Sequence, residues 1–92
     1  MQFEGSGQVS GGFRGRVSSQ DVLVVGDRAR VFGRIEADVV VIFGHVEGDV
    51  FASRRVAIHR PAIVRGTIHT ADLQVEQGAV FDGKTEAPQR MN

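Results

Sequence analysis

The sequence predicts an all-β fold, a three-sided parallel β-helix of about five to six coils, on two observations. Valine is the dominant apolar residue, glycine is abundant, and no run rich in alanine, leucine and glutamate occurs, so the composition favours strands over helices. One phrase, apolar-any-Gly-any-apolar, returns along the chain with its glycines 18, 15, 18 and 17 residues apart. A solenoid tolerates such near-equal spacing, because a coil can lose residues at a corner without disturbing its neighbours.

The repeated phrase predicts the first side of each coil. Its five copies are Phe13–Val17, Val31–Ile35, Val46–Val50, Val64–Ile68 and Phe81–Thr85. Equivalent inward side chains of stacked coils form columns, and we expect one such core column to contain Val17, Ile35, Val50 and Ile68. The glycines share the alternation phase of these residues, so Gly33, Gly48 and Gly66 are also expected to face inward, where a methyl group would overpack the core.

A second phrase follows each glycine and predicts the second side. Its copies are Val22-x-Val24, Val40-x-Ile42, Val56-x-Ile58 and Leu73-x-Val75, and a third side then passes through Ala29, Gly44, Ala62 and Ala79. Period-2 alternation within each side, with turn residues between some of them, completes the three-sided coil.

The second side also predicts an exposed apolar strip. If Val40 and Ile42 face inward, Val39, Val41 and Phe43 face outward, next to Leu23 and Val25 of the coil before. Such a strip would be a lateral contact between protofilaments, a site for a partner protein or a membrane-facing surface. The alternative is that the alternation is shifted by one residue and the strip belongs to the core.

Length and charge limit the classes of function. The 92 residues form one domain, with 1–2 expected to be a disordered N-terminus, 3–83 the β-helix and 84–92 a flexible tail. Eleven acidic and eleven basic residues balance, which argues against nucleic acid as a partner. There is no cysteine, and no apolar run approaches the roughly 20 residues of a spanning helix. We expect a cytoplasmic protein, with the inner face of the membrane as its alternative location.

No residue pattern indicates a catalytic, cofactor or metal site. His45, His59 and His69 occupy different coil positions and are interpreted as surface histidines. The glycine-rich stretches near the N-terminus are not followed by a helix or by Gly-Lys-Ser/Thr, so they do not predict phosphate binding. We therefore expect no enzymatic activity and no cofactor. Two alternatives stay open: a fragment of a hexapeptide-repeat acyltransferase, and a β-helix adaptor that does not polymerise.

Taken together, these phrases resemble the bactofilins over about Phe3 to Gly83. The matching runs are Phe3–Gly5, Phe13–Gly15, Ala29–Ala37, Val46–Val50 and Gly78–Gly83. The resemblance implies a right-handed β-helix that assembles without nucleotide into non-polar filaments, acting in bacterial shape, stalk or division-site organisation. It also implies peptidoglycan-modifying or other client proteins as partners. The coil between Gly33 and Gly48 is about three residues short, and the N-terminal segment that often targets this family to membranes is almost absent here, which leaves membrane association open.

The two ends of the solenoid are the predicted polymer interface. Terminal coils expose unpaired backbone groups and a cut hydrophobic core, which natural solenoids cover with a cap. No capping helix is predicted, so another copy of the chain is the expected cover. Large apolar residues near the ends would pack across that junction: Phe3, Phe13, Val80 and Phe81.

Overall fold

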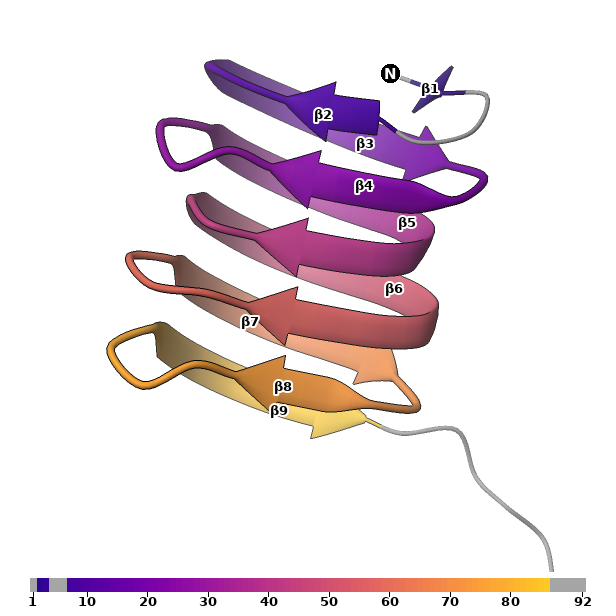
Figure 1. Cartoon of the computed structure of the whole chain (residues 1–92). Helices are drawn as coiled ribbons and strands as arrows, with labels where there is room; N and C mark the ends of the chain where they lie inside the picture. The colour runs from indigo at the N-terminus through magenta and orange to yellow at the C-terminus, as the bar shows by residue number, and fades with distance from the viewer. Residues whose placement is uncertain (1, 4–6, 87–92) are drawn as a thin grey trace, which may run out of the picture.

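A computed structural model describes residues 2–3 and 7–86, and the regular secondary structure among them consists of strands, with no helix. The nine strands are β1 (Gln2–Phe3), β2 (Gly7–Val9), β3 (Gly12–Ser19), β4 (Val22–Val25), β5 (Arg30–Ile42), β6 (His45–Ile58), β7 (Ile63–Thr70), β8 (Leu73–Val75) and β9 (Val80–Glu86). All pairings between them are parallel and form one coiled sheet (Figure 1). The all-β solenoid predicted from the repeats is confirmed.

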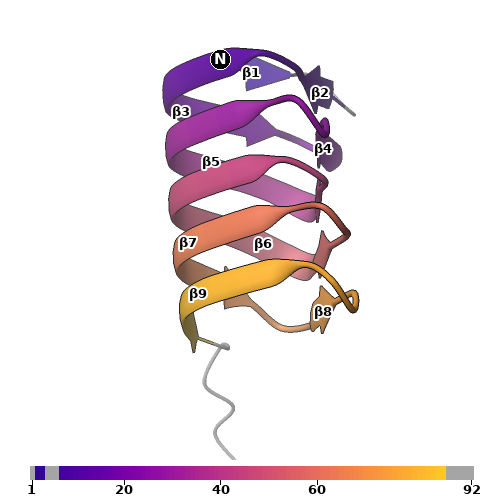
Figure 2. The ribbon, with the colours of Figure 1, turned by 90° about the vertical axis from the view of Figure 1, so that its left-hand side faces the viewer.

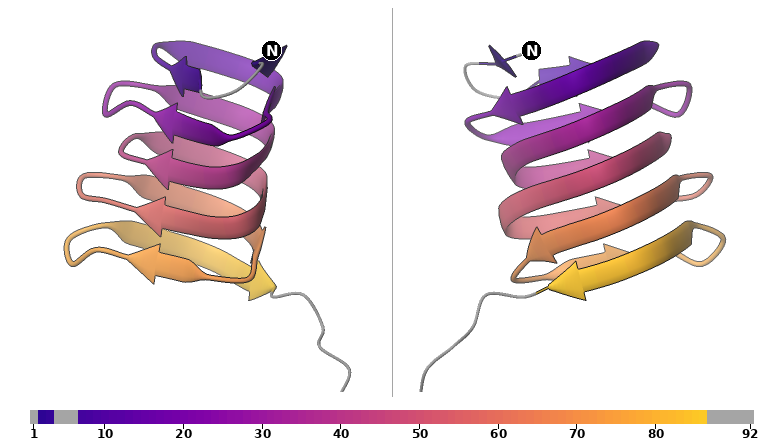
Figure 3. Two further views of the ribbon diagram at one scale, coloured as in Figure 1. Left: turned by 45° about the vertical axis from the view of Figure 1, so that its right-hand side comes forward. Right: turned by 180° about the vertical axis from the view of Figure 1, so that it is seen from behind.

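The chain winds as a right-handed coil of about five turns (Figure 1). Along one side the hydrogen-bonded order is β1-β3-β5-β6-β7-β9, and along the other β4 bridges β2 to β5 while β8 closes on β6. The strands stack one above another in side and rear views (Figures 2 and 3). Each coil therefore rests on the coil before it, about 4.8 Å away, through a ladder of backbone hydrogen bonds.

The core consists of columns of small aliphatic side chains along the solenoid axis. Register pairs Val17 with Ile35, Ile35 with Val50 and Val50 with Ile68, and all four side chains are buried. β-Branched residues suit this position because their restricted side chains pack well on a pleated surface. The column is thus built from the residues at the end of the repeated phrase.

The repeated glycines do not face the core, which corrects the expectation for Gly33, Gly48 and Gly66. They are exposed or half-exposed, and their φ angles lie between 125° and 132°. Each glycine lies between two buried positions four residues apart, such as Val31 and Ile35, so the backbone bends there instead of continuing the alternation. A Cβ at any of the three would meet the carbonyl oxygen of the glycine one coil earlier. Glycine is therefore required by backbone conformation and by close stacking of coils.

Leu23 and Val25 face the core, so their predicted outward placement was wrong. The first copy of the second phrase, Val22-x-Val24, is shifted by one residue relative to the inward positions of the other copies. The Leu23 and Val25 side chains are fully buried, and they pair in register with the inward Val40 and Ile42. Their neighbours Val22 and Val24 take the half-exposed positions. The corner before this side, at Gln20–Asp21, holds one residue more than the corner at Asp38, which changes which valine faces inward.

The coil between Gly33 and Gly48 is three residues shorter than the coil before it, and the missing residues come from two corners. At the corner after the glycine side, Asp38 alone stands where Gln20–Asp21 stand in the coil before. At the next corner, Phe43–Gly44 replaces the four-residue turn Gly26–Ala29. Gly44 is buried and leaves no room for a Cβ against the carbonyl oxygens of Gly26 and Ala29. The ladder nevertheless continues through this corner, because His45 N–H donates to the Ala29 carbonyl at 3.0 Å.

The strand boundaries differ from the predicted domain limits at both ends. Gln2 lies in β1, and β9 continues through Glu86, beyond the expected start of the tail at Lys84. Pairing with β7 extends as far as Glu86, which explains why the strand persists although its residues are polar. Met1 and the remaining tail, 87–92, lie outside the described residues.

We predict that Gly33→Ala strongly destabilises the fold. The substitution adds a Cβ at φ 132°, where it would overlap the backbone of Gly15, and should reduce the free energy of unfolding by about 3 kcal/mol or more. Thermal unfolding followed by circular dichroism at fixed protein concentration measures this. Gly12→Ala is the matched control, because a Cβ at Gly12 has nothing within 4 Å. Equal melting temperatures for the two variants would contradict the role assigned to Gly33.

Candidate assembly interface at the two ends

The C-terminal end of the solenoid presents an unpaired strand edge. β9 pairs with β7 along one edge, and no described strand pairs with its other edge. On the other side of the solenoid the last described strand is β8, which pairs with β6 along one edge. Two valines of the last coil are exposed: Val75, 46% exposed, continues the inward column of Ile58, whereas Val80, 49% exposed, continues the outward column of Ile63.

Phe81 links this end to the core. Its side chain is half-buried, packs against the core cluster and pairs in register with the buried Val64. In an inner coil the equivalent position is closed from both sides by other coils. Phe81 has such a neighbour on one side only among the described residues, so an apolar surface is left at the end.

The N-terminal end is partly covered by the chain itself. β1 pairs with the last two residues of β3, and β2 places the buried Val9 above Val25. From Gly12 to Val17, however, no described strand pairs with the outer edge of β3. The ring of the half-buried Phe13 lies 3.7 Å from the position of a Cβ on Gly15, in the space that a preceding coil would occupy. Phe3 pairs with Ser19 through its backbone, and its side chain lies outside the described part of the chain.

The exposed apolar strip of the second side has a different composition from the one expected. Phe43, Val39 and Val41 are half-exposed, as expected from their phase. The coil before contributes Val22 and Val24 in place of Leu23 and Val25, since Val22 pairs with Val39 and Val24 with Val41. We call the five residues Val22, Val24, Val39, Val41 and Phe43 the lateral strip. In the next coil its columns become polar at Arg55 and His59, so the strip covers only the N-terminal half of this side.

The three histidines lie in different columns, each beside a phenylalanine of the preceding coil. The ring centroids are 5.9 Å apart for Phe32 and His45, 5.0 Å for Phe43 and His59, and 4.3 Å for Phe51 and His69. The first pair is tilted and the other two are stacked, and such ring contacts stabilise the register between coils. Within the ranges that the structure describes, no three potential metal ligands come together, and no helix is long and apolar enough to cross a membrane.

A carboxylate fixes the last turn of the solenoid before β9. Glu76 Oε1 accepts hydrogen bonds from the Arg60 backbone N–H at 3.0 Å and from His59 Nδ1 at 3.2 Å. The bond from the Arg60 backbone, followed by that from His59, lowers the pKa of the Glu76 carboxyl below its ordinary value of 4.5. The ionised carboxylate therefore ties the turn leading to the terminal strand to the turn one coil earlier.

The end interface is only partly visible in the sequence. Phe81 can be chosen because it begins the last copy of the phrase, and Val80 because it directly precedes that copy. The second phrase places Val75 in the core column of Val25, Ile42 and Ile58, and Val75 is exposed because no described coil covers it from the other side. The charged pair beside Gly83, Asp82 and Lys84, stands out in the sequence only as part of a lateral face.

The comparison with protein families identifies one match. The sequence model of the family described as "Bactofilin: Polymer-forming cytoskeletal" matches residues 1–86. No curated protein and no solved structure matches the chain. The family match covers the whole solenoid, including both open ends.

We predict that Glu76→Gln lowers the melting temperature at neutral pH and removes part of its pH dependence. A carboxyl whose pKa is depressed on folding contributes stability above about pH 4.5, and this is lost as the pH falls through the lowered pKa. The difference in melting temperature between the wild type and the variant should thus be fully present above about pH 4.5 and vanish in strong acid. Parallel pH profiles would refute this role for Glu76.

Proposed function

The chain belongs to the bactofilin family of polymer-forming cytoskeletal proteins, and from that premise we propose that it assembles end to end, without nucleotide, into non-polar filaments. These filaments would act in the cytoplasm as a scaffold for cell shape, stalk or division-site organisation, recruit client proteins and catalyse no reaction. The observation that carries the proposal is the open edge of β9 beside the half-buried Phe81. A second copy can supply the missing backbone partners and cover the apolar end at once.

A non-polar filament requires like ends to meet across a two-fold axis. At the C-terminal end, two β9 strands can pair in antiparallel register about Gly83. This register places Asp82 opposite Lys84 of the partner copy, twice by symmetry. It also places Phe81 opposite Thr85, and both belong to inward columns of the coil. Opposite charges therefore meet on the outside while the apolar column is closed on the inside.

The same arrangement is less favourable at the N-terminal end. Two β3 strands paired about Gly15 would place Arg14 opposite Arg16 of the partner copy, and like charges directly across a ladder are destabilising. β1 also covers part of this end. We infer that the C-terminal junction forms first and that dimers joined there are the unit that polymerises.

We predict that Phe81→Arg abolishes long filaments and leaves monomers or dimers. Burying a Phe side chain is worth roughly 1.5–3 kcal/mol, and the two-fold junction contains two, so losing both weakens association at least about 100-fold. An arginine there would also be poorly solvated within the junction. Sedimentation and negative-stain electron microscopy of the purified protein without nucleotide measure the outcome.

Phe43→Arg is the matched control, because Phe43 lies on the lateral strip of an inner coil. This variant should still form filaments of normal length, even if their lateral pairing changes. Filaments of normal length from Phe81→Arg would overturn the assignment of the end interface. A wild-type chain that stays monomeric at micromolar concentration would favour the non-polymerising adaptor.

A charge substitution separates non-polar from polar assembly. In the two-fold register, Lys84→Asp replaces each of the two attractive pairs by a repulsion between Asp82 and the aspartate introduced in the partner copy. With each of the two pairs worth about 0.2–1 kcal/mol, their loss alone should raise the critical concentration about twofold to thirtyfold. Adding Asp82→Lys to the same chain should restore assembly.

A head-to-tail filament predicts the opposite result. There β9 would pair in parallel with β3 of the next copy, continuing the existing register, so that residue 84 lies opposite Arg16. Lys84→Asp would then remove a repulsion and strengthen the polymer. A lower critical concentration for this variant would therefore refute the two-fold junction.

A further inference from the structure

The second side of the solenoid is a face that no described strand covers, and its outward residues lie in rows, one for each coil. The central residues of the five rows are Gln8, Val24, Val41, Ala57 and Gln74, and each row is named after its central residue. The lateral strip occupies the Val24 and Val41 rows, whereas polar side chains predominate in the two rows after them. The apolar half of this face is therefore open to a partner.

The Ala57 row is hollowed at both ends. One open cavity of about 340 Å³ lies beside Val39, Arg54 and Arg55, and another of about 350 Å³ has Ala57 in its lining. Ala57 itself is 8% exposed. Arg55 Nε donates to Asp72 of the next coil at 3.0 Å, so this side chain is directed away from the strip. The row can thus receive protruding side chains such as valines.

Four charges frame this face, acidic at one row and basic at another. Asp21 and Asp27 flank the Val24 row at its two ends, and Arg54 and Arg60 flank the Ala57 row at the same two ends. All four residues are exposed, and none of them forms an ion pair within residues 2–3 and 7–86. The Val41 row, in the short coil, lies midway between the acidic and the basic row.

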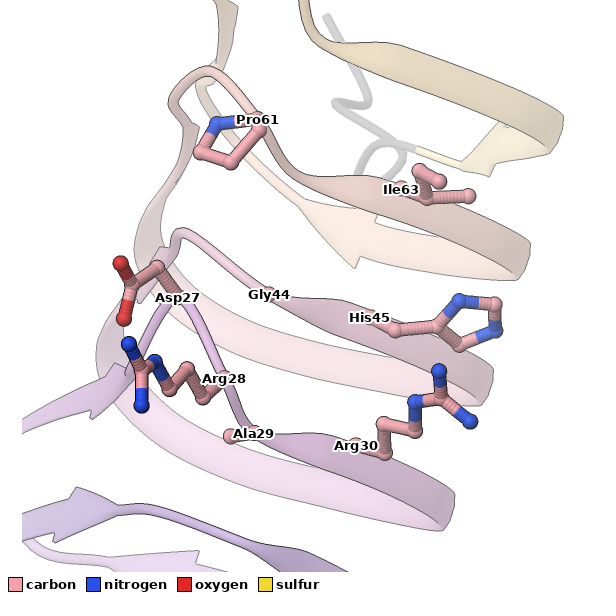
Figure 4. Close-up of a pocket in the computed structure, with 8 residues that line it drawn as sticks. All are labelled: Asp27, Arg28, Ala29, Arg30, Gly44, His45, Pro61 and Ile63. Atoms are coloured by element: carbon pink, nitrogen blue, oxygen red, sulfur yellow. The ribbon is translucent and has the colours of Figure 1, made fainter.

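The corner of the short coil leaves this middle row without a projecting turn. In the coils on either side, turns closed by the Ala29 and Ala62 N–H groups project there, and the short coil has only Phe43–Gly44. The space between the turns is a notch, an open cavity of about 380 Å³ (Figure 4). Its lining includes Arg28, Arg30, His45 and Ile63. The turns that carry Asp27 and Arg60 therefore stand on either side of the Val41 row.

We propose that the lateral strip binds a second copy of the chain, antiparallel to the first, about a two-fold axis that runs along the Val41 row. This inference rests on the proposed filaments, because the two copies belong to two neighbouring filaments. The axis sets the Val24 row of one copy against the Ala57 row of the other and keeps each column opposite itself. Antiparallel neighbours are available along a non-polar filament, since its copies already alternate in direction.

This axis brings complementary groups together. Val41 and Phe43 meet their own counterparts at the centre, and Val24 enters the hollow at Ala57 of the partner copy. At the two edges Asp21 faces Arg54 of the partner copy and Asp27 faces Arg60 of the partner copy, each twice by symmetry. An apolar centre is thus enclosed by four ion pairs, the arrangement typical of protein interfaces.

Other arrangements of the same face bring unlike groups into conflict. A parallel two-fold pair would set Asp72 against Glu76 of the partner copy. Moving the antiparallel axis half a coil toward the N-terminal end would set Asp21 against Asp38, and moving it half a coil the other way would set Val22 against Asp72. The distribution of charge therefore selects the axis along the Val41 row.

The contact is small for two isolated copies and sufficient between filaments. Three outward columns about 7 Å apart over five coils about 4.8 Å apart cover roughly 500 Å² of each copy, or about 1,000 Å² in total. Stable complexes of two proteins bury about 1,200–2,000 Å². Contacts repeated along two filaments add up, so pairing should appear once filaments have formed.

Val41→Asp separates pairing from end-to-end assembly. It sets two aspartates against each other across the axis, so the fraction of filaments that lie in pairs should fall about tenfold or more while filament length stays normal. Negative-stain electron microscopy counts the pairs, and high-speed sedimentation measures total polymer. Phe32→Asp is the matched control, because Phe32 is a half-exposed outward residue of the same strand on the first side. Its filaments should pair as the wild type does.

A charge reversal tests the register of the pair. Arg54→Asp turns both attractions to Asp21 into repulsions and should lower the paired fraction about tenfold or more. Adding Asp21→Arg to the same chain should restore pairing. Pairing that Arg54→Asp leaves unchanged, or that the double variant does not restore, would refute this axis.

Failure of pairing is distinguishable from failure of the proposed function. Wild-type filaments that stay single would overturn the pairing and leave end-to-end assembly standing, whereas a wild type without filaments would overturn both. Single filaments that sediment with phosphatidylglycerol vesicles, and that Val41→Asp releases from them, would assign the strip to a lipid surface instead.

Discussion

Each inner coil of this solenoid satisfies its backbone hydrogen bonds through the coils on either side of it. The parallel ladder runs from β1 and β2 to β9 with register kept at almost every position. A ladder of this kind has no natural end, because each added coil creates a new edge equal to the one it covers. The columnar core and the exposed ends both follow from that geometry.

The glycine column is what allows the coils to stack at this spacing. Gly33, Gly48 and Gly66 share one unusual φ, and each approaches the carbonyl of the glycine before it more closely than any Cβ would permit. The bend at the glycine turns one long strand into two sides of the coil. Aliphatic residues on either side of it can then fill the narrow interior, which explains why the same phrase returns in every coil.

Departures from the repeat are confined to corners, where they change the surface and leave the core intact. The coil that lacks three residues keeps its inward columns in register but opens the notch beside Arg30 and His45. The extra residue before Val22 reverses which valines face outward and so redefines the lateral strip. In a repeat protein, functional variety therefore resides in corners and ends, because an insertion there costs no ladder hydrogen bond.

The sequence by itself determined the solenoid, the repeat boundaries and the family, because period-2 alternation and recurring glycines are local patterns that need no knowledge of distant contacts. It also identified Phe81 as a residue of the terminal coil. Tertiary structure alone decided that Leu23 and Val25 are core, that the glycines bend the chain outside the core, and that Arg28, Arg30 and Ile63 surround one notch. These features depend on how many residues each corner holds relative to the coils above and below, and that comparison exists only once the register between coils is set.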